Sequence, residues 1–223
     1  MSDKQQVEKE SAMKLYVYEH CPFCIRARMI FGLKKVPLEL SVIMEGDVDT
    51  PTRMVGRKVV PILQKDEGVY MPESMDIVHY VDKLDGAPVI KGECDPQIDA
   101  WCKDNTRTVF NLAIPRFTRA DFKELSAPAA REAYTQREIK AFGDLDELMA
   151  NTQNYIDTLV DELGKIEAYL RARNAVSITD FYLFPVLNSL TIVKDFPYPD
   201  YLSDYLDHIA TSCNVPLFTD KAL

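Results

Sequence analysis

Two cysteines separated by two residues, Cys21 and Cys24, stand between a strand-like segment and a helical one. Residues 14–18, KLYVY, alternate and are rich in aromatic and β-branched side chains, which predicts a strand. Pro22 then occupies the place of a first helical residue, and apolar residues recur at helical spacing as far as Leu33. The first cysteine is therefore expected at the N-terminus of a helix.

Such a pair can bind a metal, form a structural disulfide or exchange electrons. A zinc site needs four ligands, commonly two cysteine pairs or one pair with two closely spaced histidines. The other cysteines and the histidines are isolated in this sequence, so a zinc or iron–sulfur site stays open only if folding gathers distant ligands. A structural disulfide is disfavoured because so short a loop removes little entropy from the unfolded chain. Electron exchange is the favoured function.

The position of Cys21 gives this function a chemical basis. Unsatisfied N–H groups and the helix dipole stabilise a thiolate at a helix N-terminus, so Cys21 is expected to be the nucleophile. Cys24, one turn further in, should have the higher pKa and should attack a mixed disulfide on Cys21. Residues 13–36 also carry five basic side chains against a single acidic one, which favours the thiolate. Arg26 and Arg28 are equally compatible with a solvated helix face.

The remaining pattern of the first half alternates strands and helices. A cysteine pair beside a βαβ pattern is typical of the thioredoxin-like fold. The order β-α-β-α-β-β-α over residues 13–85 predicts an α/β domain of this kind. After the first helix, the predicted segments are a strand over 36–44, a helical turn over 52–56, a hairpin over 58–71 and a helix over 72–84.

The second half is expected to be all helical. Residues 86–97 contain several glycine and proline residues and form a predicted linker, followed by a helical domain over 98–223. The apolar period of residues 145–170 predicts one helix. Ser177 and Asp180 have the spacing of a capping box, with a kink expected at Pro185. The predicted fold class is therefore α/β plus all-α. Residues 1–12 are expected to form a disordered tail before the first domain.

Charge and composition narrow the partners. A net charge of -9 argues against a nucleic-acid binder, which needs clustered lysine and arginine. No segment has the roughly 20 apolar residues that cross a bilayer, and the first residues lack the apolar core of a secretory signal. Cysteines in a chain that is not exported indicate a reducing compartment, so a cytoplasmic location is expected.

The segment His20-Cys21-Pro22-Phe23-Cys24 resembles the active site of glutaredoxins. Together with the helical second half, it is similar to the long bacterial glutaredoxin 2 family, which is built like a cytosolic glutathione transferase. The likeness runs from Met13 onward and includes the segments ARMIFGLK, PTRMVG, VPILQKD and MPESMDIVHYVDKLDG.

The resemblance implies a set of glutathione-binding residues. Val60 would pair its backbone with the cysteinyl group of glutathione, next to a cis peptide at Pro61. Glu73 and Ser74 match the pair that holds the γ-glutamyl end in transferases, which suits an ammonium and a carboxylate group. Lys58 would meet the glycyl carboxylate.

The expected activity is reduction of protein disulfides and protein–glutathione mixed disulfides. Glutathione would be a co-substrate, with no bound metal or other cofactor, and the resemblance implies a monomer. The alternatives are an omega-like glutathione transferase or dehydroascorbate reductase, a non-enzymatic binding or regulatory module with the transferase fold, and a metal chaperone.

Overall fold

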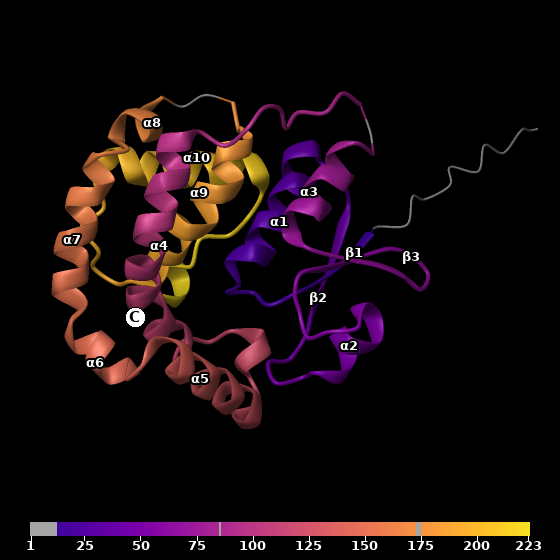
Figure 1. Cartoon of the computed structure of the whole chain (residues 1–223), viewed down its shortest axis with the longest axis horizontal. Coiled ribbons are helices and arrows are strands. Elements are labelled where there is room, and N and C mark those ends of the chain that lie inside the picture. Colours follow the sequence, from indigo (N-terminus) through magenta and orange to yellow (C-terminus); the bar gives the residue numbers. More distant parts are fainter. Residues whose placement is uncertain (1–12, 85, 173–174) are drawn as a thin grey trace, which may run out of the picture.

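The computed structural model describes residues 13–84, 86–172 and 175–223. The expected tail over residues 1–12 and the expected domain boundary at residue 85 lie outside these ranges. Figure 1 shows a sheet-containing part built from the first third of the chain beside an all-helical part built from the rest. This arrangement confirms the predicted fold class.

The first part is built on a four-stranded sheet with the order β2-β1-β3-β4. Strand β1 pairs in parallel with β2 and antiparallel with β3, and β3 pairs antiparallel with β4. The parallel pair is joined through a helix, as a βαβ unit requires. The strands are β1 Met13–Val17, β2 Leu38–Val42, β3 Ile62–Asp66 and β4 Val69–Pro72.

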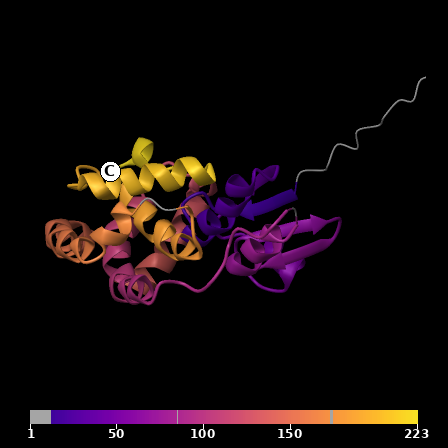
Figure 2. The ribbon, with the colours of Figure 1, turned by 90° about the horizontal axis from the view of Figure 1, so that it is seen from above.

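Helices α1 Pro22–Lys34, α2 Asp49–Val55 and α3 Ser74–Asp82 complete this part. Helices α1 and α3 pack against each other, and their buried faces join residues of β1 and β3 in one apolar core. Helix α1 also contacts the helical part, so it lies between the sheet and the second half of the chain (Figure 2). The N-terminus of α1 is thereby directed toward the junction.

Pro61 directly precedes β3, and the Val60–Pro61 peptide bond is cis. Strand β3 has partners on both sides, so it is a central strand rather than an edge. A proline here costs no ladder hydrogen bond because it lies outside the paired residues. The predicted hairpin is present and its turn is short, because β3 continues to Asp66 and β4 begins at Val69.

The helical part winds around α4 Pro96–Phe117, whose N-terminus is capped by the Asp95 carboxylate. The prediction of a single helix over residues 145–170 was wrong, since this segment divides into short helices that curve past α4 (Figure 1). Besides α4, the elements of the helical part are η1 Lys123–Leu125, α5 Pro128–Phe142, α6 Leu145–Ala150, α7 Thr152–Gly164, α8 Glu167–Arg171, α9 Ile178–Ser189, η2 Leu190–Ile192, α10 Asp200–Cys213 and η3 Thr219–Lys221.

Local hydrogen bonds explain the division. The Asn151 amide donates to the Glu147 carbonyl, and the Thr152 hydroxyl donates to the Met149 carbonyl, so side chains compete with the helix ladder there. A second break follows α7, where the N–H of Lys165 bonds three residues back. The apolar period survives both breaks because each short helix turns its apolar side to the same core.

The capping box before α9 is present as predicted. The Asp180 carboxylate accepts hydrogen bonds from the Ser177 N–H at 2.8 Å and from the Tyr205 hydroxyl at 2.9 Å. Asp180 is buried, so these bonds also satisfy a carboxylate that would be costly in an apolar interior.

Two contacts hold α1 against the helical part. Gly32 lies so close to α10 that a Cβ atom there would stand 1.7 Å from the Cys213 carbonyl oxygen. At the second contact, the Arg26 Nε donates a hydrogen bond to the Phe181 carbonyl of α9 at 2.7 Å. That carbonyl lacks its usual helical donor because Pro185 has no N–H.

No helix within the described residues is both long and apolar enough to cross a membrane.

Candidate active site

Cys21 is the N-cap residue of α1 and is half-buried at the end of the loop that follows β1. Its carbonyl accepts the first helical hydrogen bond, from Ile25 N–H at 3.0 Å. Pro22 fits the first helical position because it has no N–H to leave unsatisfied. The local sequence thus places one thiol at the positive end of a helix, as predicted.

The surroundings of Cys21 lower its pKa to about 7. A hydrogen bond from the Cys24 thiol is the largest cause, and burial opposes it. His20 in its protonated form and the backbone N–H groups of Phe23 and Cys24 lower the pKa further. Cys21 therefore holds a substantial thiolate fraction at neutral pH, which is the form that attacks disulfides.

Cys24 is fully buried, and burial together with the hydrogen bond to Cys21 raises its pKa well above the usual range. Both cysteines are free thiols. The inner cysteine keeps its proton and donates it in a hydrogen bond to the outer one. This asymmetry agrees with the expected order of the pair, in which Cys21 attacks first.

The arginines of α1 are not among the main causes of the lowered pKa of Cys21. Arg26 is directed toward the Phe181 carbonyl and lies 3.4 Å from the Ser74 hydroxyl. Neither Arg26 nor Arg28 is exposed, and burial lowers the pKa of both. Both residues are half-buried, so neither lies on a fully solvated helix face.

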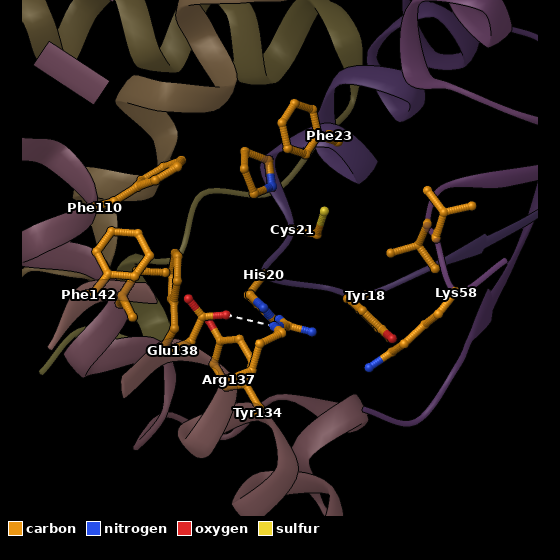
Figure 3. Close-up of a pocket in the computed structure, with 15 residues that line it drawn as sticks. Tyr18, His20, Cys21, Phe23, Lys58, Phe110, Tyr134, Arg137, Glu138 and Phe142 are labelled. Carbon is orange, nitrogen blue, oxygen red and sulfur yellow. Dashed lines mark hydrogen bonds and ion pairs between the residues drawn. The ribbon is translucent and has the colours of Figure 1, made fainter. Parts of the chain in front are cut away.

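A cleft of about 400 Å³ opens beside Cys21 between the two parts of the chain (Figure 3). One wall comes from the sheet-containing part and the other from α4 and α5. The surface is largely aromatic and apolar, with a few charged groups on one side. Its lining residues are Tyr18, His20, Cys21, Pro22, Phe23, Lys58, Val59, Val60, Phe110, Ile114, Phe117, Tyr134, Arg137, Glu138 and Phe142.

The residues expected to bind glutathione fall into two groups. Val60 and Lys58 line the cleft with Cys21, and Pro61 is buried directly behind them. Glu73 and Ser74 lie outside its lining, at the N-terminus of α3. These assignments stay predictions.

Each polar member of this set already has a partner. Glu73 is exposed and pairs with Arg57, while the Lys58 ammonium lies 3.3 Å from a carboxylate oxygen of Glu45. Glu45 is buried and receives two further hydrogen bonds from the Arg137 guanidinium, at 2.8 and 2.9 Å. The charged side of the cleft is therefore a network across both parts of the chain.

The contribution of α5 to the cleft was not predicted from the sequence. Tyr134, Arg137 and Phe142 come from this helix, whose apolar period is weak. Pro128 at its start and Gly143 at its end are the signals that mark its boundaries. Tyr18, expected to be only a strand residue, also lines the cleft.

Within the described ranges, no group of three or more histidine, cysteine or carboxylate side chains is arranged to hold a metal ion.

Residues 97–222 match the family described as glutaredoxin 2, C-terminal domain, and residues 15–89 match the glutathione S-transferase N-terminal domain. Glutaredoxin 2 of Escherichia coli strain K12 is 44% identical over 215 residues, which cover 95% of this chain and all of that protein. The chain belongs to the glutaredoxin 2 family. It is accordingly an enzyme, a glutathione-dependent thiol–disulfide oxidoreductase, as the resemblance implied.

Solved structures agree with membership of the glutaredoxin 2 family. Glutaredoxin 2 from Salmonella typhimurium, determined in complex with glutathione, has a TM-score of 0.91 and 43% identity, covering 96% of this chain and 100% of that one. Glutathione transferase GSTFuA3 from Phanerochaete chrysosporium has a TM-score of 0.72 at 14% identity, covering 91% of this chain and 97% of its own. The second likeness shows the shared fold alone.

The lowered pKa of Cys21 can be tested by alkylation in this member of the glutaredoxin 2 family. Its alkylation by iodoacetamide, followed peptide by peptide with mass spectrometry, should rise with a midpoint near pH 7 because only the thiolate reacts. Cys102 should react slowly at that pH, since burial raises its pKa to about 12. A Cys21 midpoint at about 8.5, the value of a free thiol, would contradict this electrostatic account.

Proposed function

We propose that Cys21 and Cys24 carry the oxidoreductase activity, with glutathionylated proteins and protein disulfides as substrates. The observation that supports this most is the asymmetry of the pair, an outer thiol with a lowered pKa and a buried inner thiol with a raised one. This asymmetry suits a nucleophile and a resolving thiol.

In the proposed reaction, the Cys21 thiolate attacks the glutathione sulfur of a mixed disulfide. A bond forms between Cys21 and glutathione while the bond to the substrate protein breaks, and the protein leaves as a thiolate that takes up a proton. A second glutathione thiolate then attacks the sulfur of the bound glutathione. Oxidised glutathione leaves, and the Cys21 thiolate is restored.

Protein disulfides are proposed to need the second cysteine. Cys21 attacks one sulfur of the substrate, and Cys24 then displaces the substrate from Cys21 after losing its proton. The resulting Cys21–Cys24 disulfide is reduced by two molecules of glutathione. Cys24 is fully buried, but its thiol already donates a hydrogen bond to Cys21, so it is placed to make this attack.

Glutathione is proposed to lie along Val60, with its sulfur at Cys21 and its γ-glutamyl end toward the N-terminus of α3. Val60 lines the cleft beside Cys21, which supports this path. Glu73 can accept from the ammonium group, and Ser74 and the α3 N–H groups can bind the carboxylate. Lys58 is proposed to bind the glycyl carboxylate. Its ammonium group would then give up its contact with Glu45.

The protein is further proposed to act as a monomer in the cytoplasm. All five cysteines are free thiols, which suits a reducing compartment.

Cys24→Ser tests the division of labour in the pair. The variant should retain turnover of a glutathionylated peptide, which needs Cys21 alone, but should reduce a protein disulfide at least about tenfold more slowly because no resolving thiol is present. Both rates are measured with glutathione, glutathione reductase and NADPH. Equal losses on the two substrates would argue against a resolving role, and faster turnover of dehydroascorbate than of the mixed disulfide would favour the reductase alternative.

A further inference from the structure

The loop that precedes Cys21 is held by the helical part of the chain. The His20 N–H donates to Oε1 of Glu124 at 3.1 Å, and the same oxygen lies 2.6 Å from the His20 ring nitrogen Nδ1. One residue earlier, a Glu19 carboxylate oxygen accepts from the Lys123 N–H at 2.9 Å. These contacts join segments 104 residues apart, so η1 directly positions the residue before the nucleophile.

The pair of His20 and Glu124 lies in an apolar enclosure. Glu124 is fully buried and His20 is 4% exposed. The second carboxylate oxygen of Glu124, Oε2, is buried and has no hydrogen-bond partner among the described residues. The imidazole ring contacts the aromatic rings of Tyr18, Phe117, Phe122 and Tyr134, with centroids 4.6 to 6.0 Å away.

A carboxylate in such an enclosure needs a charged partner, because an isolated buried charge costs several kcal/mol. In the described part of the chain, His20 is the ionisable side chain that bonds to Glu124, and the two form an ion pair when the ring is protonated. The Nδ1 bond also fixes one proton position on the ring. The imidazole beside Cys21 is therefore held in hydrogen-bond contact with a fully buried carboxylate.

Both charges increase the difference between the pKa values of the two thiols. The His20 charge lowers the pKa of Cys21, in addition to the larger effect of the Cys24 hydrogen bond and against burial. Burial is the main cause of the raised pKa of Cys24, and Glu124 raises it further.

We propose that Glu124 is a positioning residue for the exchange reaction, by which the helical domain holds His20 and its positive charge beside Cys21. The proposal rests on the proposed role of Cys21 as nucleophile. It gives the helical domain a part in the chemistry besides forming one wall of the cleft.

Other charged and titratable groups also face this region. They belong to η1, to α5, to η3 and to the segments after β1, after β2 and before β3. They are Tyr18, Glu19, Glu45, Lys58, Lys123, Tyr134, Arg137, Glu138 and Lys221.

Glu124→Gln tests the proposal because it keeps the shape and the acceptor oxygen but removes the charge. The readout is the pH midpoint of Cys21 alkylation, resolved by mass spectrometry, which does not depend on turnover. We expect the midpoint to rise by roughly half a unit to one unit, which leaves about 3- to 10-fold less thiolate at pH 6. His20→Gln should shift it in the same direction, and the double variant no further than the larger single shift.

The sign of the shift decides the result. If Glu124 acted on Cys21 only as a nearby negative charge, its removal would lower the midpoint. A lowered or unchanged midpoint in Glu124→Gln therefore overturns the proposal. Glu132→Gln, an exposed change on α5, is the matched control and should leave the midpoint unchanged.

Thermal unfolding establishes that each variant is folded. If Glu124→Gln does not fold, His20→Gln and Glu124→Asp carry the test. An unchanged midpoint in His20→Gln overturns the proposal, whereas a raised one, with a smaller rise in Glu124→Asp, supports it. Failure of the proposed function would be seen separately, as persistent activity in a variant without Cys21.

Discussion

Replacing Cys21 with serine is expected to abolish glutathione-dependent reduction of mixed disulfides. Serine is close to cysteine in size, but its hydroxyl is not ionised near neutral pH and does not attack sulfur. The thiol is half-buried at the cleft, so the fold should tolerate the change. Turnover of a glutathionylated peptide should fall by roughly 10³-fold or more, to the rate without enzyme.

Cys94→Ser is the matched control for this substitution. Cys94 is also half-buried but lies outside the cleft, and burial raises its pKa. The control should keep the full activity. If Cys21→Ser retained more than a few per cent of the wild-type rate while Cys94→Ser lost activity, the nucleophile would have to be sought elsewhere.

Gly32→Ala is expected to cause the largest loss of stability among the substitutions considered. The added Cβ would overlap the Cys213 carbonyl oxygen, 1.7 Å away, and this obstacle is backbone rather than a flexible side chain. Helices α1 and α10 would have to separate, which loosens apolar packing between the two parts of the chain. We expect about 3 kcal/mol of destabilisation and a fall in Tm of roughly 6–12 °C.

Gly164→Ala provides the matched comparison at the end of α7. A Cβ there has no atom within 4 Å, so alanine should be neutral or stabilise the helix by up to about 1 kcal/mol. Differential scanning calorimetry of the two variants would measure both effects. Equal melting temperatures for Gly32→Ala and the wild type would show that the close approach of α1 and α10 is easily relaxed.

The first half of the fold was predictable because its signals are local. Strand alternation before Cys21, Pro22 at a helix start and the βαβ order each depend on a few neighbouring residues. The capping box of Ser177 and Asp180 is equally local, and it is present as predicted. Such features are fixed by short-range chemistry that the sequence displays directly.

The cleft was predictable only on one side. Cys21 and Val60 were expected there, whereas Arg137 comes from a helix whose weak apolar period hid it. The pairing of His20 with Glu124 depends on segments brought together by the whole fold. Sequence periodicity also could not reveal the breaks at Asn151 and after α7, because the apolar spacing continues through both.

The contact between Arg26 and the Phe181 carbonyl links the packing of the two parts of the chain to Pro185, which lies inside the buried helix α9. Any residue at position 185 that restored an amide hydrogen would compete with the guanidinium for this carbonyl and weaken the contact. The packing of the two parts of the chain can thus be altered from within α9, by one amide hydrogen at position 185, without a change on the outer surface of the molecule.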